Sequence, residues 1–343
     1  MHQCLQSERL ARDYHSLTAS QAVERESTNR IARGSLESLV SLFTVHMVYS
    51  ISFVLGLLGT AFVAGFFGAL LGVGGGVFLV PAMVLGFHLP MKIAVAASIV
   101  SVIATSNAGG SSYVDQRITN LHLGMFLEIF TTTGALSGSI LALFLHEWFI
   151  SLIFAAMLAY MAYAAYVTRN LDDERIAGDD FAHAKPDRIS AFLDLRGSYF
   201  DQAAGKEVTY VVTGTPVGIV ISYVAGIVSG LLGVGGGVLK VSAMNRYMNV
   251  PMKVAVGTSK LMIGVTAAVS SILFFMHGLI HFMVVAPVAV GTTVGATIGT
   301  MIMNRLHSAV LKWIFSGLML YLAYEMFAKA LELGFGRHLP SLG

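Results

Sequence analysis

The chain has 343 residues, of which 55% are hydrophobic and 12% are charged, and its formal net charge is +2. This charged share is about half that of a typical soluble domain, so the composition argues against a soluble protein. No basic patch with interleaved aromatic residues is present, which argues against nucleic-acid binding. The single cysteine, Cys4, excludes an intrachain disulfide and a thiolate metal cluster.

The polar N-terminal tail, 1–38, contains five Arg and five acidic side chains. Few of its side chains are large and apolar, so we expect a mobile or surface-lying segment. The first long apolar segment begins only near Leu39. It lacks the short apolar region and early cleavage site of a secretory signal, so we interpret it as a retained membrane span.

Apolar stretches of about the length needed to cross a bilayer recur along the chain, since a core about 30 Å thick requires about 20 residues in a helix. One globular core would not hold so many apolar segments. The pattern therefore predicts an all-α polytopic membrane protein. The stretches are residues 43–64, 93–113, 121–145, 149–168, 211–233, 254–276, 280–303 and 308–330.

The chain contains an internal repeat. Residues 70–98 read LLGVGGGVFLVPAMVLGFHLPMKIAVAAS and residues 231–259 read LLGVGGGVLKVSAMNRYMNVPMKVAVGTS, with 17 of 29 positions identical at an offset of 161. We expect two homologous halves of about four transmembrane helices each, with helix breaks at the two GVGGG clusters. Duplicated halves with broken helices are typical of secondary transporters. The predicted organisation is a first transmembrane repeat at 39–168, a polar insert at 169–210, a second repeat at 211–332 and a C-terminal tail at 333–343.

The insert at 169–210 holds six Lys/Arg and nine Asp/Glu. Its Gly-centred turns and short apolar runs suit a small hairpin or lid, although we favour a solvated linker. Four spans per half place both termini and the insert on one side, and the excess of Lys and Arg there predicts the cytoplasm. An even number of spans makes the halves parallel, whereas a fifth crossing by residues 76–89 would make them inverted, and both arrangements stay open.

The glycine clusters predict an anion site. Gly costs about 1 kcal/mol relative to Ala inside a helix, so the helix is expected to unwind there. Short helices that begin at Val77 and Val238 would then direct free N–H groups into a cavity, where they favour anions. The alternative is close helix packing, which we prefer for the other glycines spaced four apart, including Gly134/Gly138 and Gly291/Gly295/Gly299. Neither cluster has the Lys-Ser/Thr of a P-loop. The predicted substrate-binding glycines are Gly74, Gly75, Gly76, Gly235, Gly236 and Gly237.

Two lysines lie within apolar sequence of the second half only. Lys240 and Lys260 stand where the first half has Leu79 and Ile99. A Lys in the centre of a span costs about 2.5–3.5 kcal/mol on insertion scales, so we expect one or both to attract an anionic substrate. The alternatives are a side chain that reaches the interface, or an ion pair with Glu128 or Glu325.

Polar side chains at matching depth would complete the site by donating to an oxyanion, although singly each is more often bonded to its own helix. Glu128 lies within a predicted span and either carries a coupling proton or pairs with a lysine. No metal-ligand spacing, cofactor motif or catalytic constellation is present, so we expect neither a metal, a cofactor nor an enzyme. The predicted substrate-binding side chains, besides Lys240 and Lys260, are Ser98, Thr105, Ser106, Asn107, Thr258 and Ser259.

The repeated motif resembles the sulfite exporter TauE/SafE family of membrane permeases. Each half carries GxGGG, an apolar run and then a segment related to P-x-K-x-A-x-x-T-S, and residues 194–210 before the second half fit the same pattern. The resemblance covers residues 50–330. It implies a bacterial inner-membrane transporter of sulfite, thiosulfate, sulfoacetate or other sulfonates, in a family of both exporters and uptake permeases. The first half departs from the pattern with Ala97-Ser98 where the second has Thr258-Ser259.

These observations predict a multi-pass secondary transporter that exports a small sulfur-containing anion across the inner membrane by alternating access. Its expected partners are the anionic substrate and the lipid bilayer, without nucleic acid, and homo-oligomerisation stays open. The first alternative is an anion channel, with the same hydrogen-bond donors. The second is a membrane-embedded enzyme or assembly subunit that carries no flux of its own.

Overall fold

The computed structural model describes residues 51–70, 74–115, 118–167, 181, 184–201, 205–303 and 308–335. The chain divides into two compact units, Met1–Val54 and Leu55–Gly343. In the described part of the second unit the structure is helical apart from one two-stranded sheet, which confirms the predicted all-α class. The predicted tails at 1–38 and beyond 335 lie outside the described residues, as does the start of the insert.

Five helices and one π-helical turn cover the first half of the chain. They are α2 (Ile51–Leu70), α3 (Gly76–Pro81), the π-helix η1 (Ala82–Gly86), α4 (Met91–Asp115), α5 (Leu121–Phe144) and α6 (Glu147–Val167).

Five helices follow in the second half, after the short helix α8 (Arg188–Phe192) and the strands β1 (Arg196–Asp201) and β2 (Lys206–Val211). They are α9 (Thr215–Leu232), α10 (Gly237–Tyr247), α11 (Met252–Met276), α12 (Phe282–Met303) and α13 (Ser308–Phe335). The first residues of α10, α11, α12 and α13 follow those of α3, α4, α5 and α6 at the offset of the sequence repeat. The repeat in the sequence is therefore also a repeat of helix starts.

Six helices in the described ranges are long and apolar enough to cross a membrane. The two remaining apolar stretches lie in α4 and α13, which are 25 and 28 residues long. The helix α10 has only 11 residues, and α3 with η1 ends at Gly86. At about 1.5 Å per residue these short helices do not reach across a bilayer. The six candidate spans are Ile51–Ala69, Leu121–Phe144, Glu147–Ala164, Thr215–Leu232, Met252–Met276 and Phe282–Met301.

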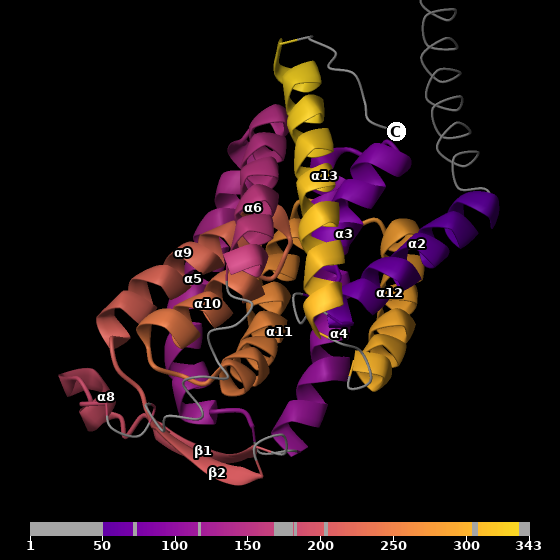
Figure 1. The fold of residues 1–343 in the computed structure, drawn as a ribbon. Helices are drawn as coiled ribbons and strands as arrows, with labels where there is room; N and C mark the ends of the chain where they lie inside the picture. Colours follow the sequence, from indigo (N-terminus) through magenta and orange to yellow (C-terminus); the bar gives the residue numbers. More distant parts are fainter. Residues whose placement is uncertain are drawn as a thin grey trace, which may run out of the picture. The chain divides into compact units, whose positions relative to one another are not determined.

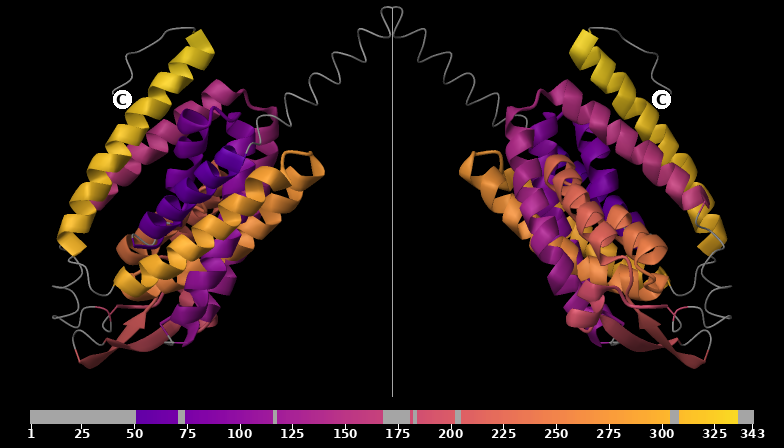
Figure 2. Two further views of the ribbon diagram at one scale, coloured as in Figure 1. Left: turned by 90° about the vertical axis from the view of Figure 1, so that its right-hand side faces the viewer. Right: turned by 90° about the vertical axis from the view of Figure 1, so that its left-hand side faces the viewer.

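Helices from the two halves of the chain pack against each other. The helix α5 packs along α9, α4 along α11, and α6 along α13. In Figure 1 the paired helices α6 and α13 run in opposite directions: α6 runs toward the end of the bundle that carries the strands, whereas α13 runs away from it. Figure 2 shows this pair together along one side of the bundle.

Glycines make the closest of these helix contacts. A Cβ atom on Gly134 or Gly138 of α5 would overlap backbone atoms of Tyr223 or Ile227 of α9. The glycines of α12 meet α2 in the same way, and a Cβ on Gly291 would lie 2.5 Å from the carbonyl oxygen of Leu58. Small residues allow helices to approach closely in lipid, so the packing interpretation of these glycines is confirmed.

The described part of the insert is a packed hairpin. Its strands β1 and β2 pair antiparallel, with Tyr199 opposite Val208. Tyr199, Val208 and Tyr210 are buried in one apolar cluster with side chains of α5, α10 and α11, including Leu127 and Met244. The interpretation as a solvated linker is therefore wrong for the hairpin, because its side chains Tyr199, Val208 and Tyr210 are buried against the helices.

We predict that Gly138→Val destabilises the bundle, because its side chain would force α5 and α9 apart. Overpacking of this kind costs about 1–3 kcal/mol, and more where backbone must move. Gly59→Val is the matched control, since a Cβ at Gly59 of α2 meets no atom within 4 Å. Thermal unfolding of the purified variants in detergent measures the difference. Equal unfolding temperatures for both variants would contradict the packing argument.

Candidate functional site

The second glycine cluster forms a tight turn between two helices. The helix α9 ends at Leu232 and α10 begins at Gly237. Between them Gly233, Gly235 and Gly236 have positive φ angles of 71°, 80° and 64°. Side chains are rarely compatible with this left-handed backbone, so three glycines placed so closely allow the chain to turn sharply between the two helices.

The first cluster lies against the second. The structure describes it from Gly74, which has a φ of 83°, and α3 begins at Gly76. A Cβ on Gly76 would lie 2.6 Å from the carbonyl oxygen of Gly233, so only glycine fits this contact. The hydroxyl of Ser98 in α4 donates to the same Gly233 oxygen at 2.8 Å. The two clusters therefore meet inside the bundle, and Ser98 supplies a hydrogen bond to the end of α9.

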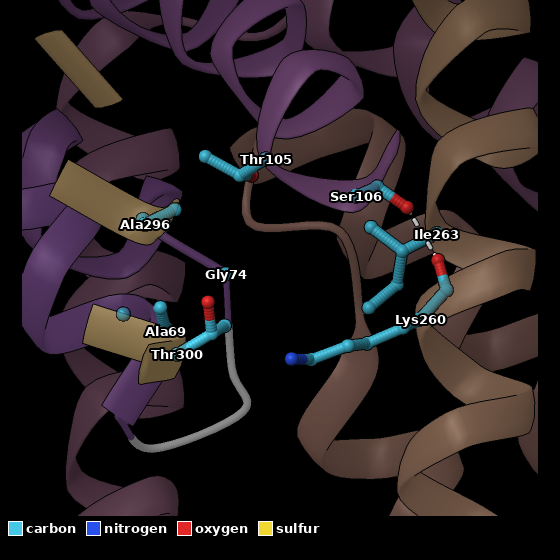
Figure 3. Close-up of a pocket in the computed structure, with 10 residues that line it drawn as sticks. Ala69, Gly74, Thr105, Ser106, Lys260, Ile263, Ala296 and Thr300 are labelled. Carbon is cyan, nitrogen blue, oxygen red and sulfur yellow. Dashed lines mark hydrogen bonds between the residues drawn. The ribbon is translucent and has the colours of Figure 1, made fainter. Parts of the chain in front are cut away.

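A small pocket of about 20 Å³, which is room for about one water molecule, lies beside the first glycine cluster. Side chains from α2, α4, α11 and α12 and the backbone of the glycine turn enclose it. The lining residues are Gly68, Ala69, Gly74, Gly75, Thr105, Ser106, Lys260, Ile263, Ala296 and Thr300. Figure 3 shows the Lys260 side chain extending across the pocket toward Gly74 and Thr300.

Lys260 is the charged residue of this lining, and its side chain is largely buried, with 8% exposed. The hydroxyl of Ser106 donates to the Lys260 carbonyl oxygen, which ties α4 to α11 at this level (Figure 3). The hydroxyl of Thr105 donates to its own helix at Val102, 3.2 Å away. One ammonium group, a glycine turn and two hydroxyl-bearing residues of α4 thus share one concave space, which is chemistry suited to a small anion.

Five of the fourteen predicted substrate-binding residues line this pocket: Gly74, Gly75, Thr105, Ser106 and Lys260. Sequence reasoning missed the other five lining residues. Ala69 and Ala296 carry no polar signal, and Thr300 follows one of the helix-packing glycines, Gly299. The spacing of those glycines indicates where α12 meets another helix, but not that a pocket opens there.

The remaining predicted residues have other surroundings. Gly76 and Ser98 make the contact between the clusters, and Asn107 is exposed. The glycines of the second cluster and Ser259 pack mainly against helices of the second half. Gly235 and Gly237 lie against Ile263, Gly236 lies against Ala225, and Ser259 donates to the Gly237 carbonyl oxygen at 3.4 Å.

Lys240 points into a different buried cluster. Its side chain is 1% exposed, and its Nζ donates to the hydroxyl of Thr266 at 3.1 Å and lies 4.0 Å from Oε2 of Glu128. The Glu128 carboxylate accepts hydrogen bonds from Thr131 and Thr132 of its own helix, both at 2.9 Å. Thr266 donates to Glu128 Oε1 at 2.7 Å. The alternative that Lys240 pairs with Glu128 is therefore the arrangement observed.

Thr258 belongs to a hydrogen-bonded link between the hairpin and the helices. Its hydroxyl accepts from the Asn120 backbone N–H at 3.0 Å, and Asn120 Nδ2 donates to the Tyr210 hydroxyl at 2.9 Å. Burial raises the pKa of Tyr210 to about 12, an effect that the hydrogen bond from Asn120 partly offsets. The Tyr210 hydroxyl therefore stays protonated at physiological pH, and the link holds β2 to the starts of α5 and α11.

Within the described ranges no group of three or more His, Cys, Asp or Glu side chains is placed to hold a metal ion.

The family model described as sulfite exporter TauE/SafE matches residues 57–326 of the chain. The chain belongs to this family. With its six candidate spans, it is a multi-pass membrane protein of a membrane transporter family.

The chain is also similar to three proteins that are named as probable membrane transporters. The chain is 25% identical over 275 residues to the probable membrane transporter protein YunE of Bacillus subtilis (strain 168), covering 78% of this chain and 93% of that protein. It is 24% identical over 251 residues to the probable membrane transporter protein YdhB of the same strain, covering 73% and 91%. It is 24% identical over 302 residues to the probable membrane transporter protein MamO of Paramagnetospirillum magneticum (strain ATCC 700264 / AMB-1), covering 81% of this chain and 45% of that protein. No solved structure matches the chain.

We predict that Tyr210→Phe loosens the hairpin, because Asn120 Nδ2 would lose its acceptor in a buried position. An unsatisfied buried donor costs about 1–3 kcal/mol. Tyr247→Phe is the matched control, since Tyr247 at the end of α10 is exposed. Hydrogen exchange of the β2 amides measures the effect: we expect faster exchange in Tyr210→Phe alone. The same exchange rate in Tyr210→Phe and in the unaltered protein would contradict this account.

Proposed function

We propose that the protein is a secondary transporter that moves small sulfur-containing anions, such as sulfite, thiosulfate, sulfoacetate or other sulfonates, across the bacterial inner membrane. The observation that carries the proposal is Lys260, a buried cation that lines a pocket with the Gly74–Gly75 turn and with Thr105 and Ser106. The family supports transport of sulfite-like anions. The pocket supplies positive charge for one small oxyanion.

The pocket suits one compact anionic group. Hydrogen bonds that involve a charged partner are shorter and stronger than neutral ones, so Lys260 would supply most of the attraction. The side chains of Ala69, Ala296 and Ile263 line the same space and offer no hydrogen bonds. We infer that they tolerate the apolar part of a short sulfonate and that one charge, rather than a cage of several, selects the anion.

The arrangement of the halves supports alternating access. Helices of the two halves pack against each other at α5–α9, α4–α11 and α6–α13, and the glycine clusters meet between them. We propose that the two halves are inverted repeats which rock about this contact, so that the pocket faces one side of the membrane at a time. Inverted halves place the insert between them on the side of the membrane opposite both termini, which departs from the common cytoplasmic side that the excess of Lys and Arg predicts.

We predict that Lys260→Met weakens anion binding by about tenfold to a hundredfold, since a hydrogen bond to a charged group contributes about 1.5–3 kcal/mol. Lys253→Met is the matched control, because Lys253 lies on the same helix with its side chain exposed. Competition between radiolabelled thiosulfate and unlabelled sulfite at the purified protein measures the affinities. Unchanged affinity in Lys260→Met would remove the pocket from the proposal.

Flux into proteoliposomes that contain only this protein tests the function itself. We expect saturable sulfite transport that thiosulfate or sulfoacetate inhibits, together with counterflow, in which external sulfite drives exchange of internal label. A channel would conduct without counterflow, and an enzyme or assembly subunit would carry no flux. No flux of any of these anions would overturn the sulfur assignment.

A further inference from the structure

The buried cluster around Lys240 corresponds by the repeat to part of the Lys260 pocket. Thr266, which accepts from Lys240, is the repeat-related counterpart of Thr105 of that pocket. The counterparts of other lining residues are closely packed. Ala135 and Ser139, which correspond to Ala296 and Thr300, are both buried, and the hydroxyl of Ser139 donates to Gly230. A Cβ on Gly230 of α9, the counterpart of Ala69, would overlap the carbonyl oxygen of Ala135. The helices α5 and α9 therefore close the counterpart of the pocket, and Lys240 lies beside it.

A carboxylate takes the place that an anion would have beside Lys240. The Lys240 ammonium donates to the Thr266 hydroxyl, which in turn donates to Glu128 Oε1. Lys240 Nζ lies 4.0 Å from Glu128 Oε2. Glu128 is 13% exposed and accepts hydroxyl hydrogen bonds at both oxygens. The cluster therefore already balances one buried positive charge with one negative charge.

A second anion could not enter this cluster unless a charge left it. With Lys240 and Glu128 both ionised, the whole negative charge of an incoming anion would be buried without compensation, which is strongly unfavourable. If Glu128 takes up a proton, Lys240 loses its internal partner and can compensate one negative charge of the anion. The proton ends on a carboxylate oxygen of Glu128, and no other bond is made or broken.

Other charged groups are not placed to take over this role in the described residues. The helix α9, which packs along α5, carries no charged side chain, and its Tyr223 hydroxyl lies 3.4 Å from Ser137, farther along α5. On α11, Lys260 lines the pocket beside Gly74, and Lys253 is exposed. On α10 the other charged residue is Arg246, in its last turn.

We infer that Lys240 and Thr266 form a second anion position, repeat-related to the Lys260 pocket, which an oxyanion occupies only when Glu128 is protonated. The inference rests on the proposed transport of small anions. It makes the proton the coupling ion, because the anion that moves through this position must be accompanied by a proton on Glu128. By linkage, the anion must raise the proton affinity of Glu128 as much as the proton raises the affinity for the anion.

The transport test uses thiosulfate, because its charge is constant across the neutral and mildly acidic range, whereas sulfite titrates there. In proteoliposomes we expect acid on the side of the anion to drive accumulation by the unaltered protein. Its apparent affinity should improve by about tenfold for each pH unit over which Glu128 is ionised in the free protein. Glu128→Gln imitates the protonated form, so we expect thiosulfate exchange to persist with a pH-independent affinity and without accumulation driven by the pH gradient.

Two further variants separate this role from a structural one. Glu332→Gln removes a carboxylate that pairs with Lys329 at 2.9 Å outside the cluster, and should retain the normal pH dependence. The double variant Glu128→Gln/Lys240→Met leaves no lone charge buried, so its fold should survive, and we expect it to lose thiosulfate transport. Normal pH dependence in Glu128→Gln, or normal transport by the double variant, would overturn the inference.

A binding measurement distinguishes failure of this inference from failure of the proposed function. Calorimetry of the detergent-solubilised protein with thiosulfate, in two buffers of different ionisation enthalpy, counts the protons taken up on binding. We expect close to one proton for the unaltered protein and none for Glu128→Gln. Binding without proton uptake would overturn the inference and leave the transporter proposal standing, whereas no binding of thiosulfate, sulfite or sulfoacetate would overturn both.

Discussion

The contact between the two glycine clusters is the constraint on which the rest of the structure depends. Gly76 lies so close to the Gly233 carbonyl oxygen that no side chain fits between them, and Ser98 donates to that same oxygen. Unwound backbone inside a membrane must find hydrogen-bond partners within the protein, because lipid supplies none. The second turn therefore obtains a partner from α4 of the first half, and the two halves are joined where each helix is interrupted.

This joint also explains why a pocket exists beside it. The glycine turns end one helix and begin another within a short stretch of chain, so backbone rather than side chains occupies the centre of the bundle. At Gly74 a Cβ would meet no atom within 4 Å, which is the open side of the turn facing the pocket. Longer side chains reach into that space from the surrounding helices, and Lys260 is the one that brings charge. The absence of side chains from the turn and the reach of Lys260 together define the site.

The sequence predicted the parts of this arrangement that depend on local pattern. Apolar length predicted the helices, and the four-residue spacing of Gly134 and Gly138 predicted a close helix contact. The clustering of glycine and hydroxyl residues with Lys260 predicted half of the pocket lining. The sequence could not predict the contacts between residues that lie far apart along the chain. Only the fold shows that Glu128, rather than a substrate, faces Lys240, and that the charged insert carries apolar side chains buried under α5, α10 and α11.

The two lysines show why a repeat is informative even where its copies differ. Lys240 and Lys260 both replace apolar residues of the first half, Leu79 and Ile99, yet Lys240 lies beside the Glu128 carboxylate whereas Lys260 lines a pocket. A buried lysine beside a carboxylate forms an electrically neutral pair, which attracts anions poorly, whereas a lysine that lines a pocket can meet an anion there. Glu128 compensates the buried charge of Lys240 while the counterpart of the pocket is closed. Because a single proton neutralises a carboxylate, the residue that stabilises the closed arrangement is also the one whose protonation would allow an anion to pair with Lys240.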